Sequence, residues 1–420
     1  DGRVKFFAKG AIKGEWLLTM AYDSDKEDAD GETLHQQIDP DTYYPLYGDN
    51  TQQGYEASSA DNLYIKLERN QFYALFCDFE TGLNVTELSR YSRNLNGFKT
   101  EWQSKHLEVT AFASETKQAF VKDEIRGDGT SGLYRLSADP IVINSEQVVI
   151  ETRGRLHDEV IVNVETLARH TDYEIDYDDG TLFFKQPVPS RDDDFNPVYI
   201  VVRYETVASD DAQLNYGGRA AVKLLNDKIE IGASYIHEEA GTDEGDLVGF
   251  DATIQITENT TLRLEAAQTD TKETGVNADG DAYLAELEHR SEDLDTRVYY
   301  RQQDEDFGLD QQSVSESGTR KIGAEADYRV NDRVEVGGEI YRQDNLETDA
   351  TRDVAEADIS YGRDNWKVRA GYREARDEFE SGEEERSSQA LVGADVTTMD
   401  GKLTLHADHE KSLGENDENS

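Results

Sequence analysis

The eight histidines are the first residues to test for catalysis or metal binding, and they are scattered along the chain. His406 and His409 are the closest pair, three residues apart within an expected strand. Side chains of a strand alternate between its two faces, so these two point to opposite sides and are poorly placed to share a metal ion. The other six are His35, His106, His157, His170, His237 and His289.

Nucleophile and cofactor motifs give no enzymatic signal either. The sequence lacks a G-x-S-x-G elbow, an H-E-x-x-H motif and a P-loop. Cys77 is the only cysteine, which excludes an internal disulfide and a cysteine-based zinc site. It has the strand phase of Leu75 and Phe79, so we expect a small buried residue rather than a nucleophile. With 90 acidic residues, paired carboxylates occur throughout and mark no site. We therefore expect a protein that is not an enzyme and has no cofactor.

One acidic loop could hold a hard cation. Residues 23–62 include Asp23, Asp25, Asp28 and Asp30, whose carboxylates are the oxygen ligands that Ca²⁺ prefers. Their spacing departs from that of an EF-hand, and the terminal glutamate of that motif is missing. A solvated acidic loop is the favoured interpretation, and a Ca²⁺ site is the alternative.

The charge balance limits the partners. The 420 residues include 43 basic and 90 acidic ones, a formal net charge of −47. Nucleic-acid binding requires a basic surface, and so does docking on an anionic membrane surface, so both are disfavoured. No stretch approaches the roughly 18–20 apolar residues of a membrane-spanning helix.

Alternation with a period of two residues is the dominant pattern. In residues 320–343, RKIGAEADYRVNDRVEVGGEIYRQ, apolar or small residues alternate with charged ones, which predicts a hairpin with one apolar and one charged face. From residue 213 onward a strand, a short polar turn, a second strand and a long acidic connection recur. The short turns fall at Asn226-Asp227, Glu258-Asn259, Glu292-Asp293, Asn331-Asp332, Asp364-Asn365 and Asp400-Gly401. The long connections are 237–246, 270–281, 303–319, 343–353 and 374–388.

Strands of ~9–11 residues that alternate apolar-out and polar-in, with short turns at one end and long loops at the other, are typical of transmembrane β-barrels. Tyrosines near the long-loop ends fit an aromatic girdle at the lipid interface: Tyr235, Tyr300, Tyr341, Tyr361 and Tyr372, all but Tyr341 on the apolar phase. We predict an all-β fold, an antiparallel transmembrane β-barrel of about 18 or more strands. A soluble β-sheet array, whose apolar face would be buried between sheets, is the alternative.

The charged phase would face a wet lumen, where opposite charges on neighbouring strands form ladders. A solvated sheet face would have similar chemistry. The predicted lumen-facing charges are Arg297, Arg301, Glu325, Asp327, Glu339, Asp358, Arg369 and Arg373.

The chain divides into four parts. Residues 1–118 contain about six barrel strands, 209–411 contain about twelve, and 412–420 form a polar tail. Residues 119–208 break the hairpin pattern with short strands and four of the six prolines, which predicts an inserted extramembrane β-domain on the long-loop side.

The segments LYIKLERNQFYALFCDFETGLNVTELSRYSR, FVKDEIRGDGTSGLYRLS and DYEIDYDDGTLFFKQPVPSRDDDFNPVYIVVRYE carry a resemblance. They resemble the core of large Gram-negative outer-membrane β-barrel surface proteins, often given OmpA-family labels, over roughly residues 1–208. A shorter phrase, DYEIDYDDGTLFF, is similar to segments of the type 9 secretion translocon. The resemblance implies a bacterial outer-membrane location, with the long loops and the insert facing the exterior. Many such barrels end on an aromatic residue, whereas this chain ends KSLGENDENS, so we expect further strands or a partner that closes the barrel.

The expected function is a surface scaffold or a conduit with a charged lumen; a soluble extracellular acidic β-sheet protein that self-assembles or binds partners is the alternative. The expected partners are outer-membrane lipid and lipopolysaccharide, with a protein partner through 119–208 and no nucleic acid.

Overall fold

The computed structural model describes residues 4–24, 57, 59, 62–154, 161–192, 196–207, 212–240, 243–273, 275–309, 311–312, 316–363, 365–398 and 403–413. Its regular elements are 25 β-strands in three sheets, so the predicted all-β class is confirmed. In these ranges no helix is long and apolar enough to cross a membrane.

The largest sheet contains 18 antiparallel strands, six before the insert and twelve after it, as predicted. Each strand pairs with the next along the chain, and β6 pairs with β14 across the insert. The first six are β1 (Lys5–Ile12), β2 (Trp16–Asp23), β3 (Leu63–Arg69), β4 (Phe72–Glu80), β5 (Asn94–Gln103) and β6 (Leu107–Thr116). The other twelve are β14 (Gln213–Leu224), β15 (Ile229–Ala240), β16 (Asp243–Thr257), β17 (Thr260–Glu273), β18 (Val276–Arg290), β19 (Leu294–Gln303), β20 (Thr319–Asn331), β21 (Val334–Asn345), β22 (Thr351–Arg363), β23 (Trp366–Glu378), β24 (Glu384–Thr398) and β25 (Leu403–Ser412).

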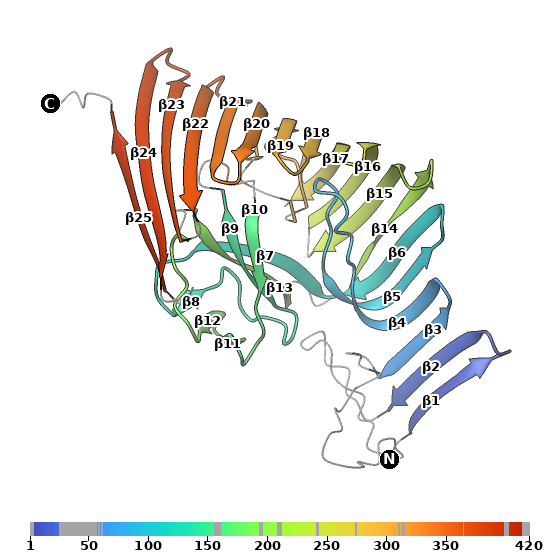
Figure 1. Ribbon diagram of the computed structural model, residues 1–420. Helices are drawn as coiled ribbons and strands as arrows, with labels where there is room; N and C mark the ends of the chain where they lie inside the picture. The colour runs from blue at the N-terminus through green and yellow to red at the C-terminus, as the bar shows by residue number, and fades with distance from the viewer. Residues whose placement is uncertain are drawn as a thin grey trace.

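The sheet is strongly curved, and its two edge strands, β1 and β25, lie at opposite ends of the curve (Figure 1). The pairings described for these strands are β1 with β2 and β25 with β24. Both edges therefore present backbone N–H and C=O groups that can pair with further strands.

Two of the short turns place both of their central residues in the left-handed region of backbone conformation. Lys13 and Gly14, between β1 and β2, have φ of 52° and 72°. Asn226 and Asp227, between β14 and β15, have φ of 57° and 65°. Asn, Asp and Gly tolerate this left-handed region best, so these residues fix the hairpin positions.

The acidic connections differ from the sequence expectation, because most of their residues continue the strands. β16 and β18 are each 15 residues long, and only the connection between Gln303 and Thr319 is long in the manner predicted. Alternation persists through the acidic segments, and their carboxylates find cross-strand partners. Arg320 donates to Asp344 at 2.7 Å, and Arg342 donates to Asp353 at 2.7 Å. Such pairs neutralise charged side chains that we expected, from the sequence, to lie in solvated loops.

The two faces of the large sheet are inverted relative to a soluble protein. Phe250, Ile340 and Val392, on the apolar phase, are 63%, 62% and 59% exposed. Glu286 and Lys321, on the polar phase, are both 4% exposed. The soluble-array alternative required the apolar face to be covered by a second sheet, and the described residues leave it uncovered. An apolar exterior and a polar interior are the arrangement of a transmembrane barrel.

The insert forms two smaller sheets. The four-stranded sheet has the order β10-β9-β13-β7, and the three-stranded sheet has the order β11-β12-β8. The strands are β7 (Gln118–Arg126), β8 (Tyr134–Arg135), β9 (Gln147–Arg153), β10 (Ile161–Thr166), β11 (Tyr173–Asp176), β12 (Thr181–Phe184) and β13 (Val198–Val207). Its apolar core includes Leu182, Ile200, Val202 and Tyr204, which are all 0–1% exposed. The insert therefore has a hydrophobic core of its own.

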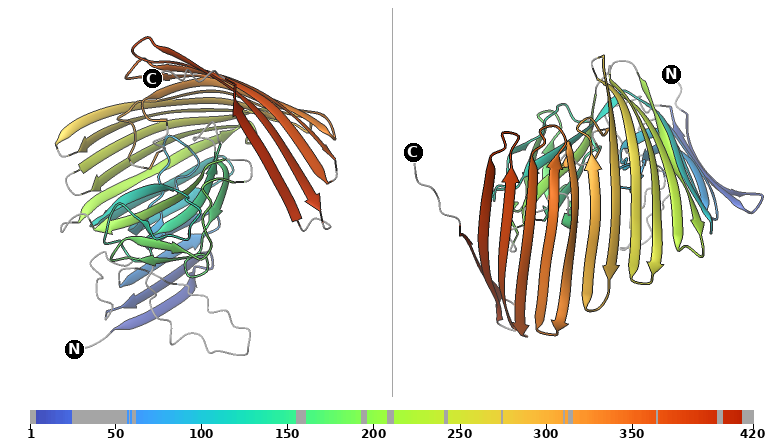
Figure 2. Two further views of the ribbon diagram at one scale, coloured as in Figure 1. Left: turned by 90° about the vertical axis from the view of Figure 1, so that its left-hand side faces the viewer. Right: turned by 90° about the horizontal axis from the view of Figure 1, so that it is seen from above.

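The insert lies on the concave side of the large sheet, as the views in Figures 1 and 2 show. The chain leaves the sheet after Thr116, the last residue of β6, and returns at Gln213, the first residue of β14. These two residues are cross-strand partners, so the insert takes the place of a hairpin connection between β6 and β14. The concave side is the polar phase of the sheet. The insert is thus placed against the charged face rather than the apolar one.

Candidate functional site: the concave face of the sheet

A row of charged side chains crosses the concave face. Arg297, Glu325, Glu339, Glu356 and Arg373 are successive cross-strand partners on β19 to β23. Arg297 Nε lies 2.8 Å from Glu325 Oε1. The row has an arginine at each end and three glutamates between them, so it carries an excess of one negative formal charge.

The remaining predicted lumen residues share this face, but they do not form one cluster. Arg369 lies 3.6 Å from Asp395 on the next strand. Asp327 and Asp358 lie opposite the same residue, Gly337, from its two neighbouring strands. The structure thus places all eight predicted charges on the concave phase, and their contact with a water-filled lumen stays a prediction.

Two connections fold back onto the concave face instead of projecting from it. The first inward loop comprises residues 81–93, and the second comprises 304–309 and 311–312. Tyr91 of the first is 0% exposed and its ring stacks on Phe112 of β6, with centroids 5.6 Å apart. Leu309 of the second joins the same apolar cluster. The inward loops therefore narrow the space enclosed by the sheet.

Hydrogen bonds fix the inward loops to the sheet and to each other. Glu265 Oε2 on β17 accepts the backbone N–H groups of Glu87 and Leu88, both at 2.9 Å. The Gln312 side-chain amide donates to the backbone oxygen of Arg90 at 3.1 Å and of Leu88 at 3.3 Å. Arg301 forms ion pairs with Glu87 and, at 2.6 Å, with Glu316. Arg301, predicted to face the lumen, therefore serves to hold a loop.

Arg93, at the end of the first inward loop, connects the insert to the large sheet. Its side chain is 0% exposed, and it donates to both carboxylate oxygens of Glu205 on β13, at 3.0 and 2.5 Å. A third donor, Nη1, binds Glu238 on β15. Burial raises the pKa of Glu205, and the guanidinium of Arg93 opposes that rise. Bidentate pairing in a desolvated site makes this a strong polar contact between the insert and the sheet.

The predicted tyrosine girdle holds only in part. Tyr235 and Tyr372 are 40% and 46% exposed on the apolar face, whereas Tyr341 is 6% exposed on the other face, as its phase predicted. Tyr361 is a correction: it packs on Trp366, with ring centroids 5.5 Å apart, across the short turn between β22 and β23. It lies at the short-turn end because β22 runs from Thr351 to Arg363, so Tyr361 is close to its last residue.

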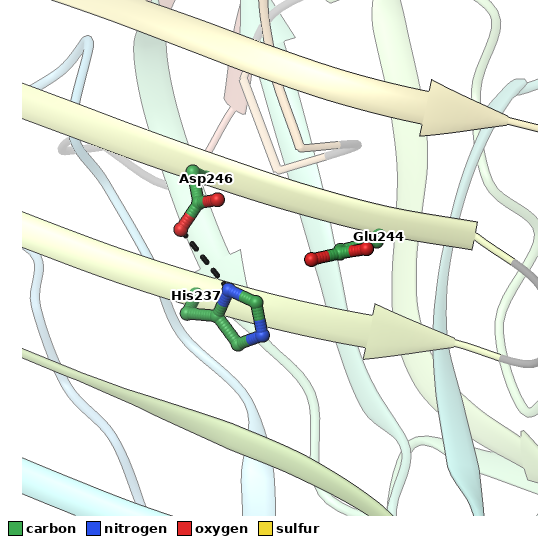
Figure 3. A group of neighbouring side chains, drawn as sticks. All are labelled: His237, Glu244 and Asp246. Atoms are coloured by element: carbon green, nitrogen blue, oxygen red, sulfur yellow. Dashed lines mark hydrogen bonds and ion pairs between the residues drawn. The ribbon is translucent and has the colours of Figure 1, made fainter. Parts of the chain in front are cut away.

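A histidine and two carboxylates meet on β15 and β16: His237, Glu244 and Asp246 (Figure 3). Their ligand atoms lie within 4.8 Å of one another, and His237 Nδ1 is 3.0 Å from Asp246 Oδ1. Nitrogen and oxygen donors of this kind suit a divalent ion such as Zn²⁺. Tyr235 donates to the same Asp246 oxygen at 2.6 Å, so hydrogen bonds within the group also account for its geometry.

The expected Ca²⁺ loop is only partly described. Asp23 ends β2, is buried and lies 3.5 Å from Lys5 Nζ. Asp25, Asp28 and Asp30 lie outside the described residues. Asp23 therefore has a structural partner of its own.

The sequence interpretation missed the inward loops and Arg93. Arg93 is 112 residues from Glu205 and 145 from Glu238, so no local pattern links them. No local signal distinguishes this buried arginine from a solvated one.

Comparisons with known proteins give one family match. A model described as Gram-negative porin matches residues 188–348, from the end of the insert through β21, which is less than half of the chain. A search of curated proteins found no match.

Solved structures give long but distant matches. Acinetobacter baumannii OccAB3 is 11% identical, with 95% of this chain and 87% of that chain covered and a TM-score of 0.34. Pseudomonas aeruginosa OccK2 (OpdF), in complex with glucuronate, is 10% identical, with 97% and 90% covered and a TM-score of 0.35. The P pilus usher (PapC) translocation pore is 13% identical, with 98% and 80% covered and a TM-score of 0.39.

The sheet and the porin match together identify a β-barrel-type protein of the Gram-negative outer membrane. The match is to a family of channels, in agreement with the expectation that the chain is not an enzyme. The predicted resemblance is supported at this level; none of these matches is to OmpA-labelled surface proteins or to the type 9 translocon.

Proposed function

We propose that the chain is an outer-membrane channel whose interior is obstructed by the insert and the two inward loops. The main support for this proposal is that the insert lies on the charged concave face, where buried Arg93 holds it. The conduit interpretation is preferred to a passive scaffold because a scaffold has no need for segments folded against its polar interior.

The porin match supports a channel, and the match includes β14 to β21, the strands that carry Arg297, Glu325 and Glu339. In the proposed pore these charges line the aqueous path, and the excess of glutamates between the two arginines favours cations locally. The end of the sheet that carries the insert and the connection between β19 and β20 faces the cell exterior in this arrangement.

A conducting form has both sheet edges paired. Within the hydrocarbon region an unsatisfied backbone polar group costs several kcal/mol, so β1 and β25 cannot remain open there. Conductance is therefore measured on protein extracted from native outer membrane rather than on protein refolded from denaturant.

Planar-bilayer recordings of the full chain and of an Arg93→Met variant test the proposal. We expect small or infrequent openings for the full chain and larger or more frequent ones for the variant, because the insert has lost its buried anchor. Arg342→Met removes an exposed ion pair with Asp353 and is the matched control. Its conductance should equal that of the wild-type chain. Absence of conductance from all three proteins would contradict the channel and favour a scaffold.

A further inference from the structure

A cavity of about 300 Å³ lies where the insert meets the large sheet and the inward loops. It is bounded by β7, β9, β10 and β13 of the insert, by β17 of the sheet and by both inward loops. Its volume is at the lower end of the usual range for small-molecule sites, ~300–1,000 Å³. Val85 and Ile161, 61% and 43% exposed, form apolar parts of its lining.

The charge of the cavity is opposite to that of the protein. Five of its lining residues are cationic and three are acidic, so 5 − 3 gives a local formal charge of +2 in a chain of −47. The cations are Arg90, Lys122, Arg153, Arg203 and Arg263, and the acids are Glu87, Glu124 and Glu151. One of the acids, Glu87, is already paired with Arg301, which is not part of the lining. Cations from the first inward loop and from four different strands thus converge in a strongly acidic protein.

Some of these cations have close carboxylate partners. Lys122 lies 2.6 Å from Glu124, and Arg153 lies 2.7 Å from Glu124 and 2.8 Å from Glu151. Although burial alone would raise it, the pKa of Glu124 is lowered to about 2 by Arg153 and Lys122. Glu124 therefore remains ionised and is paired with both cations.

Arg203 and Arg90 are less well compensated. The nearest carboxylate described for Arg203 is Glu151 at 3.6 Å, and its side chain is only 13% exposed. For Arg90, the contact described is a long one, 3.4 Å from Nε to Asn84 Oδ1. Burial, followed by the nearby charge of Arg90, lowers the pKa of Arg203, which is the effect of a cation short of counter-charge. A desolvated guanidinium beside another guanidinium is a costly arrangement unless an anion joins it.

We propose that this cavity binds a small anion with a carboxylate or phosphate group, held between Arg90 and Arg203 and reached by Lys122. Guanidinium groups match the two oxygens of such a group with paired hydrogen bonds. Glu87 and Glu124 at the same cavity repel additional negative charge, so the site suits a compact anion rather than a polyanion. The inference rests on the cavity and does not depend on ion conduction.

Calorimetric titration of the full chain in detergent, with malonate and with inorganic phosphate, tests this site. Choline, a cation of similar size, is the non-binding control. We expect binding of at least one anion, and affinity at least about tenfold weaker in both Arg203→Gln and Arg90→Gln, the effect of losing a charge-assisted hydrogen bond. Glu151 keeps its 2.8 Å partner Arg153 in the first variant, so the fold should persist.

Arg342→Gln is the matched control for removal of one arginine, because its pair with Asp353 lies on exposed strands β21 and β22. It should leave the affinity unchanged, and thermal unfolding of all variants confirms that they are folded. Malonate binding alone identifies a carboxylate site, and phosphate binding alone a phosphate site. Equal affinity in the wild type and both cavity variants, or no binding of either anion, would overturn the proposal.

Discussion

Replacing Arg93 by methionine removes the charge at the junction of insert and sheet while keeping most of the side-chain volume. In the wild type the Arg93 side chain is 0% exposed and forms ion pairs with Glu205 on the insert and Glu238 on β15. The backbone N–H of Arg93 still donates to Thr81 Oγ1 at 2.9 Å, so the inward loop keeps a main-chain anchor. The variant therefore isolates the guanidinium.

The expected cost follows from the burial of the groups left behind. The carboxylate of Glu205 is 2% exposed and that of Glu238 is 13% exposed. Removing one partner of a buried ion pair destabilises a protein by about 3–5 kcal/mol, because the other charge remains desolvated and uncompensated. We expect a loss in this range for docking of the insert at pH 8.

The loss should shrink as the pH falls. Burial raises the pKa of Glu205, and Arg93 is the group that opposes the rise, so the variant raises this pKa further. A carboxyl whose pKa is higher in the folded state contributes stability below its unfolded pKa and loses it as the pH rises through the folded pKa. Protonated Glu205 is neutral and no longer needs a counter-charge. The difference between variant and wild type should thus be smaller at pH 5 than at pH 8.

Limited proteolysis of the insert against guanidinium concentration, in detergent, measures its release at both pH values. Arg342→Met is the control, since exposed pairs of this kind contribute about 0–1 kcal/mol. A change below about 1 kcal/mol at pH 8, within the range of the control, would refute the assignment of Arg93 as the anchor. A loss that is independent of pH would refute the role given to Glu205.

Three further changes test other parts of the structure. Burial raises the pKa of Tyr204 to about 12. The stability that neutral Tyr204 contributes is therefore complete below pH 10 and should fall as the pH rises from about 10 to 12. Tyrosinate absorbance reports the ionisation, and circular dichroism reports the loss of structure. A Cβ at Gly280 would lie 2.5 Å from the backbone nitrogen of Phe307. Gly280→Val should therefore cost about 1–3 kcal/mol and expose the second inward loop to protease. Unchanged cleavage would count against the packing of this loop on β18. Ile340→Arg places a charge on the lipid face at a cost of about 2–4 kcal/mol near the bilayer centre and should reduce the heat-modifiable, folded fraction on a gel, whereas Glu339→Gln on the other face should not.

Strand phase was predictable because it depends on immediate neighbours. A period of two residues places Ile340 and Glu339 on opposite faces whatever the rest of the chain does, and Asn226-Asp227 marks a hairpin by its backbone preference alone. The strand count and the polar interior follow from these two signals.

Features that depend on tertiary partners could not be predicted. The acidic connections were assigned to solvent because the sequence does not show that Arg320 will lie beside Asp344. The error for Tyr361 is of another kind, since the predicted short turn at Asp364-Asn365 follows it closely and already placed it at the short-turn end. The fold of residues 81–93 onto the concave face depends on Glu265, far along the chain, accepting two of its backbone N–H groups.

The chemistry of the junction bears on whether the insert can move. The described apolar clusters keep to one side of it: the core around Ile200 and Tyr204 lies within the insert, and the cluster around Tyr91 and Leu309 lies within the sheet and the inward loops. Polar contacts join the two sides, such as Asn94 Nδ2 donating to the backbone oxygen of Ser145 at 3.2 Å. Polar interfaces between units with separate cores resemble transient interfaces and allow relative motion. An insert held this way can leave the sheet by exchanging ion pairs for water, without exposing a hydrophobic core. This is the property that a reversible obstruction of a channel requires, and one that a permanently sealed interior would not need.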